Sequence, residues 1–399
     1  MIKHMLKLVW NRKRINFLIT LEIFFSFLVT FIVIVMAVYY IDNYRQPLGF
    51  SYENVWHISI DMKQTTDDTW TPEQVHTTRQ LAQSMQEFPE VEMVAGALSG
   101  PYTSGARSGS YEINGRRMEF QINEVTDNFK ELMGLNLIQG RWFNQQDNGV
   151  DWKPVVINYR LSRELFGNED PLGKNIFPPN FNNKKDIRVI GVVTDFRKDG
   201  ELAAPAFYVF ERKDLSNIKE RPTRNLLVKL RAGTTASFEE KLITKLQAVA
   251  KDWSFEITPL IELRESSLKF WLTPLIALGL VAIFLMIMVA LGLTGVLWQS
   301  VTQRTKEIGL RRAKGATAIN IYCQILGELF LIATIALVFG TGIVLQFPLL
   351  NIIGFVSAKV YLLSLLISLA IIYLLTLICG LYPSRLAMRI HPAEALHYE

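Results

Sequence analysis

Four long stretches of the 399-residue chain are almost wholly apolar, at 17–41, 271–298, 319–347 and 360–382. The first contains one charged residue, Glu22, and the third contains one, Glu328, whereas the other two contain none. A helix of about 20 apolar residues is long enough to cross the hydrocarbon core of a bilayer. The pattern therefore predicts a membrane protein with four transmembrane helices.

The segment between the first two apolar stretches, 42–270, has a different pattern. Short apolar runs alternate with turn residues, which is typical of a folded domain with both strands and helices. Thr71, Pro72 and Gln74 form a helix-start pattern, and Asn114-Gly115 between two alternating runs predicts a β-hairpin. Further strands are expected at 91–98, 155–157, 188–193 and 254–257, and helices at 72–88, 161–166 and 237–250. We predict a large mixed α/β domain in two subdomains.

Short-loop charges predict the orientation, because Lys and Arg concentrate on the cytoplasmic side of a membrane. Cationic residues are dense before the first helix and in the segment 299–318, and they recur in the tail 383–399, whereas the loop 348–359 has one lysine. We therefore expect both termini and 299–318 in the cytoplasm, and 42–270 and 348–359 outside. Residues 1–16 have the pattern of an amphipathic helix lying on the lipid surface. The first apolar stretch is longer than the core of a secretion signal, so it is expected to be a retained anchor.

Composition points to few candidate catalytic or ligand-binding residues. The formal net charge of +5 is explained by the cations near the membrane and does not call for nucleic acid. The only cysteines, Cys323 and Cys379, lie in apolar stretches, so no disulfide is expected in the outer domain. His57 and His76 stand alone, and Asp67-Asp68 lies in a polar loop. We expect no catalytic residues, no metal and no cofactor in this chain.

Several longer motifs carry a family resemblance. They are EVTDNFKELMGLNLIQGRWF (124–143), VVINYRLSRELFGNEDPLGKNI (155–176), RVIGVVTDFR (188–197), RTKEIGLRRAKGATAINIYCQILGELFLI (304–332) and YPSRLAMRIHPAEALHYE (382–399). The first three resemble the extracytoplasmic domain of MacB-like ABC transporter permeases, and the last two resemble the FtsX-like permease signature. Lys314 and His397 depart from the usual family pattern, an aliphatic residue and an arginine respectively.

The resemblance implies a permease of the bacterial cytoplasmic (inner) membrane that works as a dimer with a second, identical or related, permease. A cytoplasmic ABC ATPase would bind ATP and move the outer domain. The chain lacks the phosphate-binding motif G-x-x-x-x-G-K-[ST], so we expect the ATPase to be a separate subunit. Export of a peptide, an antibiotic or a lipid-linked molecule is the first expectation, and a periplasmic adaptor and an outer-membrane channel stay open as partners. The alternatives are lipoprotein extraction or control of a cell-wall enzyme, as in FtsX- and Lol-like systems, and a membrane-anchored sensor.

The segment 299–318 is the predicted coupling loop. A short helix over 307–313 would place Ile308 and the two arginines on one face, and Gly315 suits its C-terminus. Charge alone favours ordinary membrane anchoring. With the family resemblance, we expect contact with the ATPase through Glu307, Ile308, Gly309, Arg311, Arg312 and Gly315.

Two carboxylates within apolar stretches are candidate functional residues, since an intramembrane charge often marks a functional site. Glu22 and Glu328 both lie toward the expected cytoplasmic ends of their helices, where pairing with basic residues is favoured over a proton relay. Residues 262–270 continue a helical pattern outward from the second membrane helix. With the outer end of the first helix, they are expected to form a stalk that carries movement to the outer domain.

Overall fold

The protein is described by a computed structural model over residues 13–62, 70–113, 116–176, 186–217, 220–303, 308–311, 314–350 and 356–388. The chain divides into two compact units. The helical unit combines the start of the chain to Asp42 with Leu272 onward, and the outer unit is Asn43–Trp271. The predicted N-terminal amphipathic helix lies largely outside the described residues.

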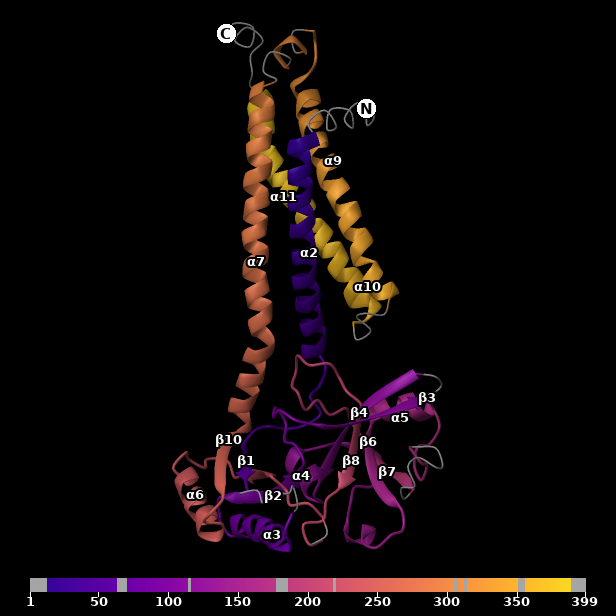
Figure 1. Ribbon diagram of the computed structural model, residues 1–399, viewed down its shortest axis with the longest axis vertical. Helices are drawn as coiled ribbons and strands as arrows, with labels where there is room; N and C mark the ends of the chain where they lie inside the picture. Colours follow the sequence, from indigo (N-terminus) through magenta and orange to yellow (C-terminus); the bar gives the residue numbers. More distant parts are fainter. Residues whose placement is uncertain are drawn as a thin grey trace. The chain divides into compact units, whose positions relative to one another are not determined.

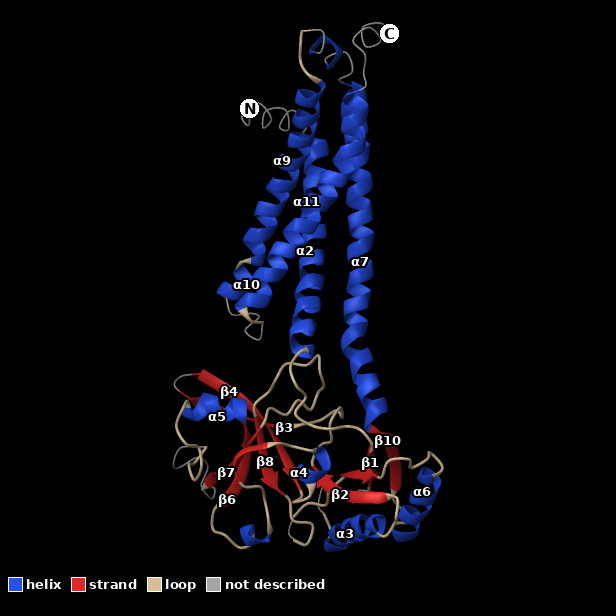
Figure 2. Cartoon of the chain, turned by 180° about the vertical axis from the view of Figure 1, so that it is seen from behind, coloured by secondary structure: helices blue, strands red, loops and turns tan. Residues whose placement is uncertain are grey.

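The helical unit is built from long apolar helices (Figure 2). They are α2 (Lys13–Tyr44), α7 (Leu260–Gln303), α9 (Ala318–Val344), with the short α10 (Gln346–Leu349), and α11 (Ala358–Met388). Four of these helices are long and apolar enough to cross a membrane. The predicted fold class of four membrane helices with a mixed α/β domain between the first two is confirmed.

Glycines allow the helices to approach each other closely in the core of the helical unit. A β-carbon placed on Gly340 of α9 would lie 2.5 Å from the Phe27 ring of α2, and one on Gly380 of α11 would lie 2.5 Å from Leu326 of α9. Phe27 is fully buried. Without an aqueous phase between the helices, such small-residue contacts provide much of their association.

The outer unit contains a 10-stranded mixed sheet with the order β10-β1-β9-β2-β4-β8-β6-β7-β5, and β3 pairs with β4. The strands are β1 (Val55–Asp61), β2 (Val91–Ala97), β3 (Arg107–Ile113), β4 (Arg116–Val125), β5 (Leu137–Gly140), β6 (Lys153–Asn158), β7 (Ile187–Val193), β8 (Tyr208–Arg212), β9 (Asn225–Leu230) and β10 (Ser254–Pro259). The helices are α3 (Pro72–Gln86), α4 (Phe129–Met133), α5 (Tyr159–Phe166) and α6 (Phe238–Val249), with a 3-10 turn at Gln145–Asp147.

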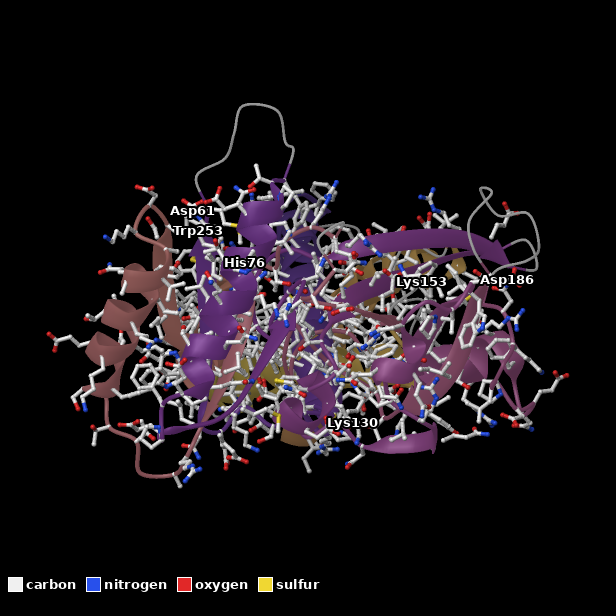
Figure 3. The ribbon with its side chains drawn as sticks, turned by 90° about the horizontal axis from the view of Figure 1, so that it is seen from below. Asp61, His76, Lys130, Lys153, Asp186 and Trp253 are labelled. Atoms are coloured by element: carbon white, nitrogen blue, oxygen red, sulfur yellow. The ribbon has the colours of Figure 1, made fainter. Side chains whose placement is uncertain are left out.

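The sheet has two halves that meet between β2 and β4, where the strand pairing is narrow but an apolar core is shared by both halves. Ala97 of β2 and Val125 of β4 are the only residues that pair across this junction among the described strands. In one half, α3 and α6 pack along β2 and β10 (Figure 1), and in the other half α5 packs on β6 and β7. Figure 3 shows the separation of the halves, since Asp61 and Trp253 lie at one end and Lys153 and Asp186 at the other. The two predicted subdomains are thus two halves of one continuous sheet.

Local sequence signals explain several element boundaries. The Thr71 hydroxyl accepts a hydrogen bond from the Gln74 backbone N–H at 3.3 Å, and the Gln74 side chain accepts one from the Thr71 N–H at 2.9 Å. This reciprocal cap confirms the predicted start of α3. The predicted hairpin is confirmed by the antiparallel register of β3 and β4, although Asn114 and Gly115 themselves lie outside the described residues.

Candidate functional site

The connector, residues 299–318, takes in the end of α7 and the beginning of α9, and between them it contains a short helical stretch that ends as the sequence predicts. Residues 308–311 are helical. The Lys314 N–H donates to the Leu310 carbonyl and the Ala316 N–H donates to the Arg311 carbonyl, both at 3.0 Å. Gly315 adopts a φ of +93°, in the left-handed region where glycine is favoured. This is a Schellman-type helix end, and it confirms the expected role of Gly315 at a helix C-terminus.

Neighbouring side chains of the connector face in opposite directions. Ile308 is only 7% exposed and belongs to the apolar core of the helical unit. Gly309 is also buried, whereas Leu310 is 49% exposed. Ile308 therefore holds the connector in place, and the apolar group presented on its surface is Leu310, which sequence reasoning missed. Glu307 and Arg312 lie outside the described residues.

Arg311 is joined to α9 by a hydrogen-bond relay. Its Nη1 donates to Gln324 Oε1 at 2.8 Å, and Gln324 Nε2 donates to Glu328 Oε1 at 3.4 Å. Gln324 and Glu328 are one helical turn apart, so the relay runs along one face of α9. The structure therefore brings together two of the predicted residues, Arg311 and Glu328, through a third that was not predicted.

Glu22 lies beside a glycine of another membrane helix. A β-carbon on Gly292 of α7 would lie 2.8 Å from Glu22 Oε2. The Glu22 carboxylate thus reaches the backbone of α7 at this glycine. The structure places Glu22 and Glu328 on different helices and does not assign either a chemical role.

The outer unit has no cluster of His, Cys, Asp and Glu suited to a metal ion within the described part of the chain. His57 in β1 is 6% exposed, and its Nε2 lies 3.0 Å from Asn225 Oδ1. Burial lowers the pKa of His57, while Asn225 and Glu256 act in the opposite direction. The histidine is a buried core residue, and His76 is exposed on α3. Asp67 and Asp68 lie outside the described residues.

A cleft of about 970 Å³, lined by both charged and apolar side chains, lies in the outer unit against β3, β4, β6 and β8. Its charged groups pair with each other: Arg107 bonds Glu124 and Glu211, and Lys153 Nζ lies 2.7 Å from Glu211 Oε2. Burial would raise the pKa of Asp147, but the guanidinium of Arg141 at 2.6 Å and a backbone N–H hold that pKa below its ordinary value. These charged groups of the cleft are therefore held in ion pairs within the described part of the outer unit.

Models of two known protein families match the chain, one over most of the outer unit and one over most of the helical unit. A model of the MacB-like periplasmic core domain matches residues 26–245, which is more than half of the chain. The chain belongs to this MacB-like family. A model of the FtsX-like permease C-terminal region matches residues 279–392 and includes the connector. Together the matches describe a multi-pass membrane protein that corresponds to the permease part of MacB/FtsX-type ABC transporters.

The MacB-like chain is similar to several curated proteins named macrolide export ATP-binding/permease protein MacB. The protein of Bdellovibrio bacteriovorus is 27% identical over 296 residues, which are 70% of this chain and 44% of that protein. The protein of Neisseria meningitidis serogroup A is 29% identical over 230 residues, which are 55% of this chain and 34% of that protein. The chain thus spans less than half the length of these relatives.

A crystal structure of the periplasmic region of MacB from Actinobacillus actinomycetemcomitans also aligns with the MacB-like chain. It is 19% identical, and the alignment covers 54% of this chain and 92% of that one with a TM-score of 0.39. A score this low adds nothing to the family match, which is decided by the sequence.

Proposed function

We propose that this MacB-like chain couples ATP hydrolysis by a cytoplasmic ABC ATPase to movement of its outer domain. The observation that carries the proposal is the geometry of the connector. A short helix, anchored by Ile308, tied to α9 by Arg311 and ended at Gly315, presents Leu310 at its surface. An exposed apolar side chain beside cations on a rigid element suits docking onto a protein rather than contact with water alone.

The ATPase is supplied from outside these 399 residues, because they contain no G-x-x-x-x-G-K-[ST] motif. The positive charge of the connector supports a cytoplasmic position for it, and hence for both termini. A second permease, as a copy of this chain or a relative, completes the transporter. The connector residues proposed for contact with the ATPase are Glu307, Ile308, Gly309, Arg311, Arg312 and Gly315. Leu310 is added to them because its side chain is exposed, whereas the buried Ile308 supports the contact by holding the connector in place.

Export of a peptide, an antibiotic or a lipid-linked molecule is the finer proposal. It is supported by the name of the relatives, which are macrolide export proteins. The same lever suits lipoprotein extraction or control of a cell-wall enzyme, and the match to the FtsX-like permease region favours this as the second candidate. The cleft on β3 and β4 contains self-paired charges and does not select one substrate.

The proposal is tested by capture from native membranes. The tagged full-length chain is solubilised, purified and analysed by mass spectrometry, in parallel with Leu310→Asp and with Glu87→Gln. Glu87 is an exposed residue of the outer unit that pairs with Lys245 at 2.9 Å, so it serves as the matched control. We expect an ABC ATPase with the unmodified chain and the control, and about tenfold less with Leu310→Asp. Equal capture by all three would contradict docking at the connector.

A further inference from the structure

The loop that follows β7, residues 194–207, binds the end of α2 through one buried arginine. Arg197 is 3% exposed. Its Nη1 donates to the carbonyls of Asn43 at 2.6 Å and Gln46 at 3.2 Å. Asn43 Nδ2 in turn donates to the Leu202 carbonyl at 3.1 Å. Carbonyls at a helix C-terminus lack partners within the helix, so a guanidinium placed there satisfies them and complements the helix dipole.

Arg197 also fixes the shape of its own loop. Its Nη2 donates to the carbonyls of Glu201 and Ala203, each at 2.7 Å. One planar guanidinium therefore bridges the end of α2 and the far side of the β7–β8 loop with four hydrogen bonds. Charge-assisted bonds of this kind are about twice as strong as neutral ones, and their geometry is restricted by the fork of the guanidinium.

The same loop binds the beginning of α7. Glu201 Oε1 accepts a hydrogen bond from Arg264 Nε at 2.5 Å, and both groups are largely buried. The Ser267 hydroxyl donates to the Asp199 carbonyl at 3.2 Å. The Arg264 guanidinium also lies over the Tyr52 ring, 4.9 Å from its centre. Helix α7 runs from Leu260 to Gln303 and so continues into the second apolar stretch.

The β7–β8 loop is in turn fastened to the outer unit. Lys198 is 2% exposed, and its Nζ donates to the Gly105 carbonyl at 2.7 Å. A β-carbon on Gly49 would lie 1.8 Å from the Asp195 carbonyl oxygen, so the chain beyond α2 passes directly against the loop. A buried loop held at several points moves as part of the domain rather than independently of it.

We infer that Arg197 and Glu201 are positioning residues that attach the ends of the first and second membrane helices to the outer domain at one loop. Movement of α2 or α7 is then delivered to the sheet through β7, which the loop follows directly. The inference rests on the proposed function, because these contacts can transmit movement only if the ATPase moves the helices. In the stalk expected at 262–270, Arg264 and Ser267 are the residues that contact this loop.

The test separates transmission from ordinary folding. Full-length chain, with Cys323 and Cys379 replaced by serine, is captured with its ATPase and reconstituted in nanodiscs. Spin labels at Leu349 in the helical unit and Asn168 in the outer unit report the distance between the units with and without a non-hydrolysable ATP analogue. Both labelled positions are exposed. ATP hydrolysis and the melting temperature are measured on the same samples.

Four variants are compared. Glu201→Gln and Arg264→Gln each break the charged pair, the double variant removes both partners, and Glu87→Gln removes an exposed ion pair elsewhere in the outer unit. Arg197→Lys is a further variant, but the test does not depend on it because a fully buried arginine can be required for folding. Two residues acting as one contact are expected to be non-additive, so the double variant should lose no more than either single one.

We expect nucleotide to change the label distance in the unmodified complex and in Glu87→Gln. In the Glu201 and Arg264 variants the change should fall by half or more, while ATP hydrolysis continues and the melting temperature stays within a few degrees. Two results would overturn the inference and leave the proposed function standing. One is unreduced movement in these variants, and the other is movement that is lost only when the protein also unfolds. An unmodified complex that hydrolyses ATP without any change in distance would overturn the proposed function and the inference with it.

Discussion

Arg311 Nη1 donates a hydrogen bond to Gln324 Oε1 at 2.8 Å, which joins the connector to the first turns of α9. Because Gln324 also contacts Glu328, the connector has a polar attachment to a residue one turn deeper along the helix. Under the proposed function, this attachment is the route by which force on the connector would reach α9.

Two neighbouring connector residues are expected to have different roles. Ile308→Ala should lower the melting temperature of the purified chain, because it leaves a cavity in the core of the helical unit and such truncations cost about 2–5 kcal/mol when fully buried. Leu310→Ala should leave the melting temperature unchanged and reduce ATPase capture, because Leu310 is 49% exposed. Thermal unfolding in detergent and quantitative mass spectrometry measure the two effects. The reverse assignment of effects would show that the connector has the opposite orientation.

Acid should destabilise the outer unit through His57. Burial lowers the pKa of His57 in the folded protein, so below the ordinary histidine value of about 6.5 the unfolded chain binds a proton that the folded chain does not. Stability is therefore complete above that value and is lost as the pH falls toward the folded pKa, by at most about 1.4 kcal/mol per pH unit for one group.

His57→Gln removes this titration and keeps a donor toward Asn225, and His76→Gln is the control because His76 is exposed. The melting temperature of the full chain is measured at pH 7.5 and 5.5. We expect a smaller fall in His57→Gln than in the unmodified protein and in His76→Gln. The same fall in all three proteins would show that His57 does not contribute.

The close approach at Gly49 should make this residue irreplaceable. Gly49 has a φ of +80° and Gly149 a φ of +78°, so alanine is strained at both positions. The strain alone costs about 1–2 kcal/mol. At Gly149 a β-carbon meets nothing within 4 Å, whereas at Gly49 it meets the Asp195 carbonyl oxygen at 1.8 Å. Gly49→Ala should therefore cost at least about 3 kcal/mol, enough to unfold part of a domain of ordinary stability.

Limited proteolysis of the outer unit in the full-length chain compares the two glycine variants. We expect rapid cleavage of Gly49→Ala and near-normal protection of Gly149→Ala. Equal protection of both would mean that the chain next to Asp195 has space to shift.

A second pair of glycines tests the contact between α2 and α7. Gly292→Leu should displace the Glu22 side chain from α7, because the β-carbon would lie 2.8 Å from Glu22 Oε2. Gly295→Leu has the same effect on helix propensity, and a β-carbon there meets nothing within 4 Å. We expect a lower melting temperature in detergent for Gly292→Leu alone. A lower value for Gly295→Leu as well would indicate that this face is also packed, for example against a second permease.

The sequence was sufficient for features that depend on composition or on local hydrogen bonds. The membrane helices follow from apolar length, and the start of α3 follows from Thr71 and Gln74, whose side chains cap the helix reciprocally. Strands β1, β5, β8 and β9 were not predicted, because a short apolar run alone does not distinguish a strand from a buried helical segment. The positions of β8 and β9 in the middle of the sheet depend on pairing with strands far away in sequence.

The site was only partly predictable for a related reason. Helical spacing places Ile308 and Arg311 on one face of a short helix, but it does not say whether that face packs inward. The structure shows Ile308 buried and Leu310 exposed. Arg197 had no local signal at all, because a buried arginine looks like any other arginine until the carbonyls of Asn43 and Gln46 are brought to it.

ATP hydrolysis by the purified chain tests the central claim most directly. It is measured on the chain freed of its ATPase, on the captured complex, and on the complex carrying Leu310→Asp. The account predicts no hydrolysis by the chain alone, hydrolysis by the complex, and a loss of activity in material purified through Leu310→Asp because the ATPase is no longer retained. Sustained hydrolysis by the chain without any companion protein would contradict the account.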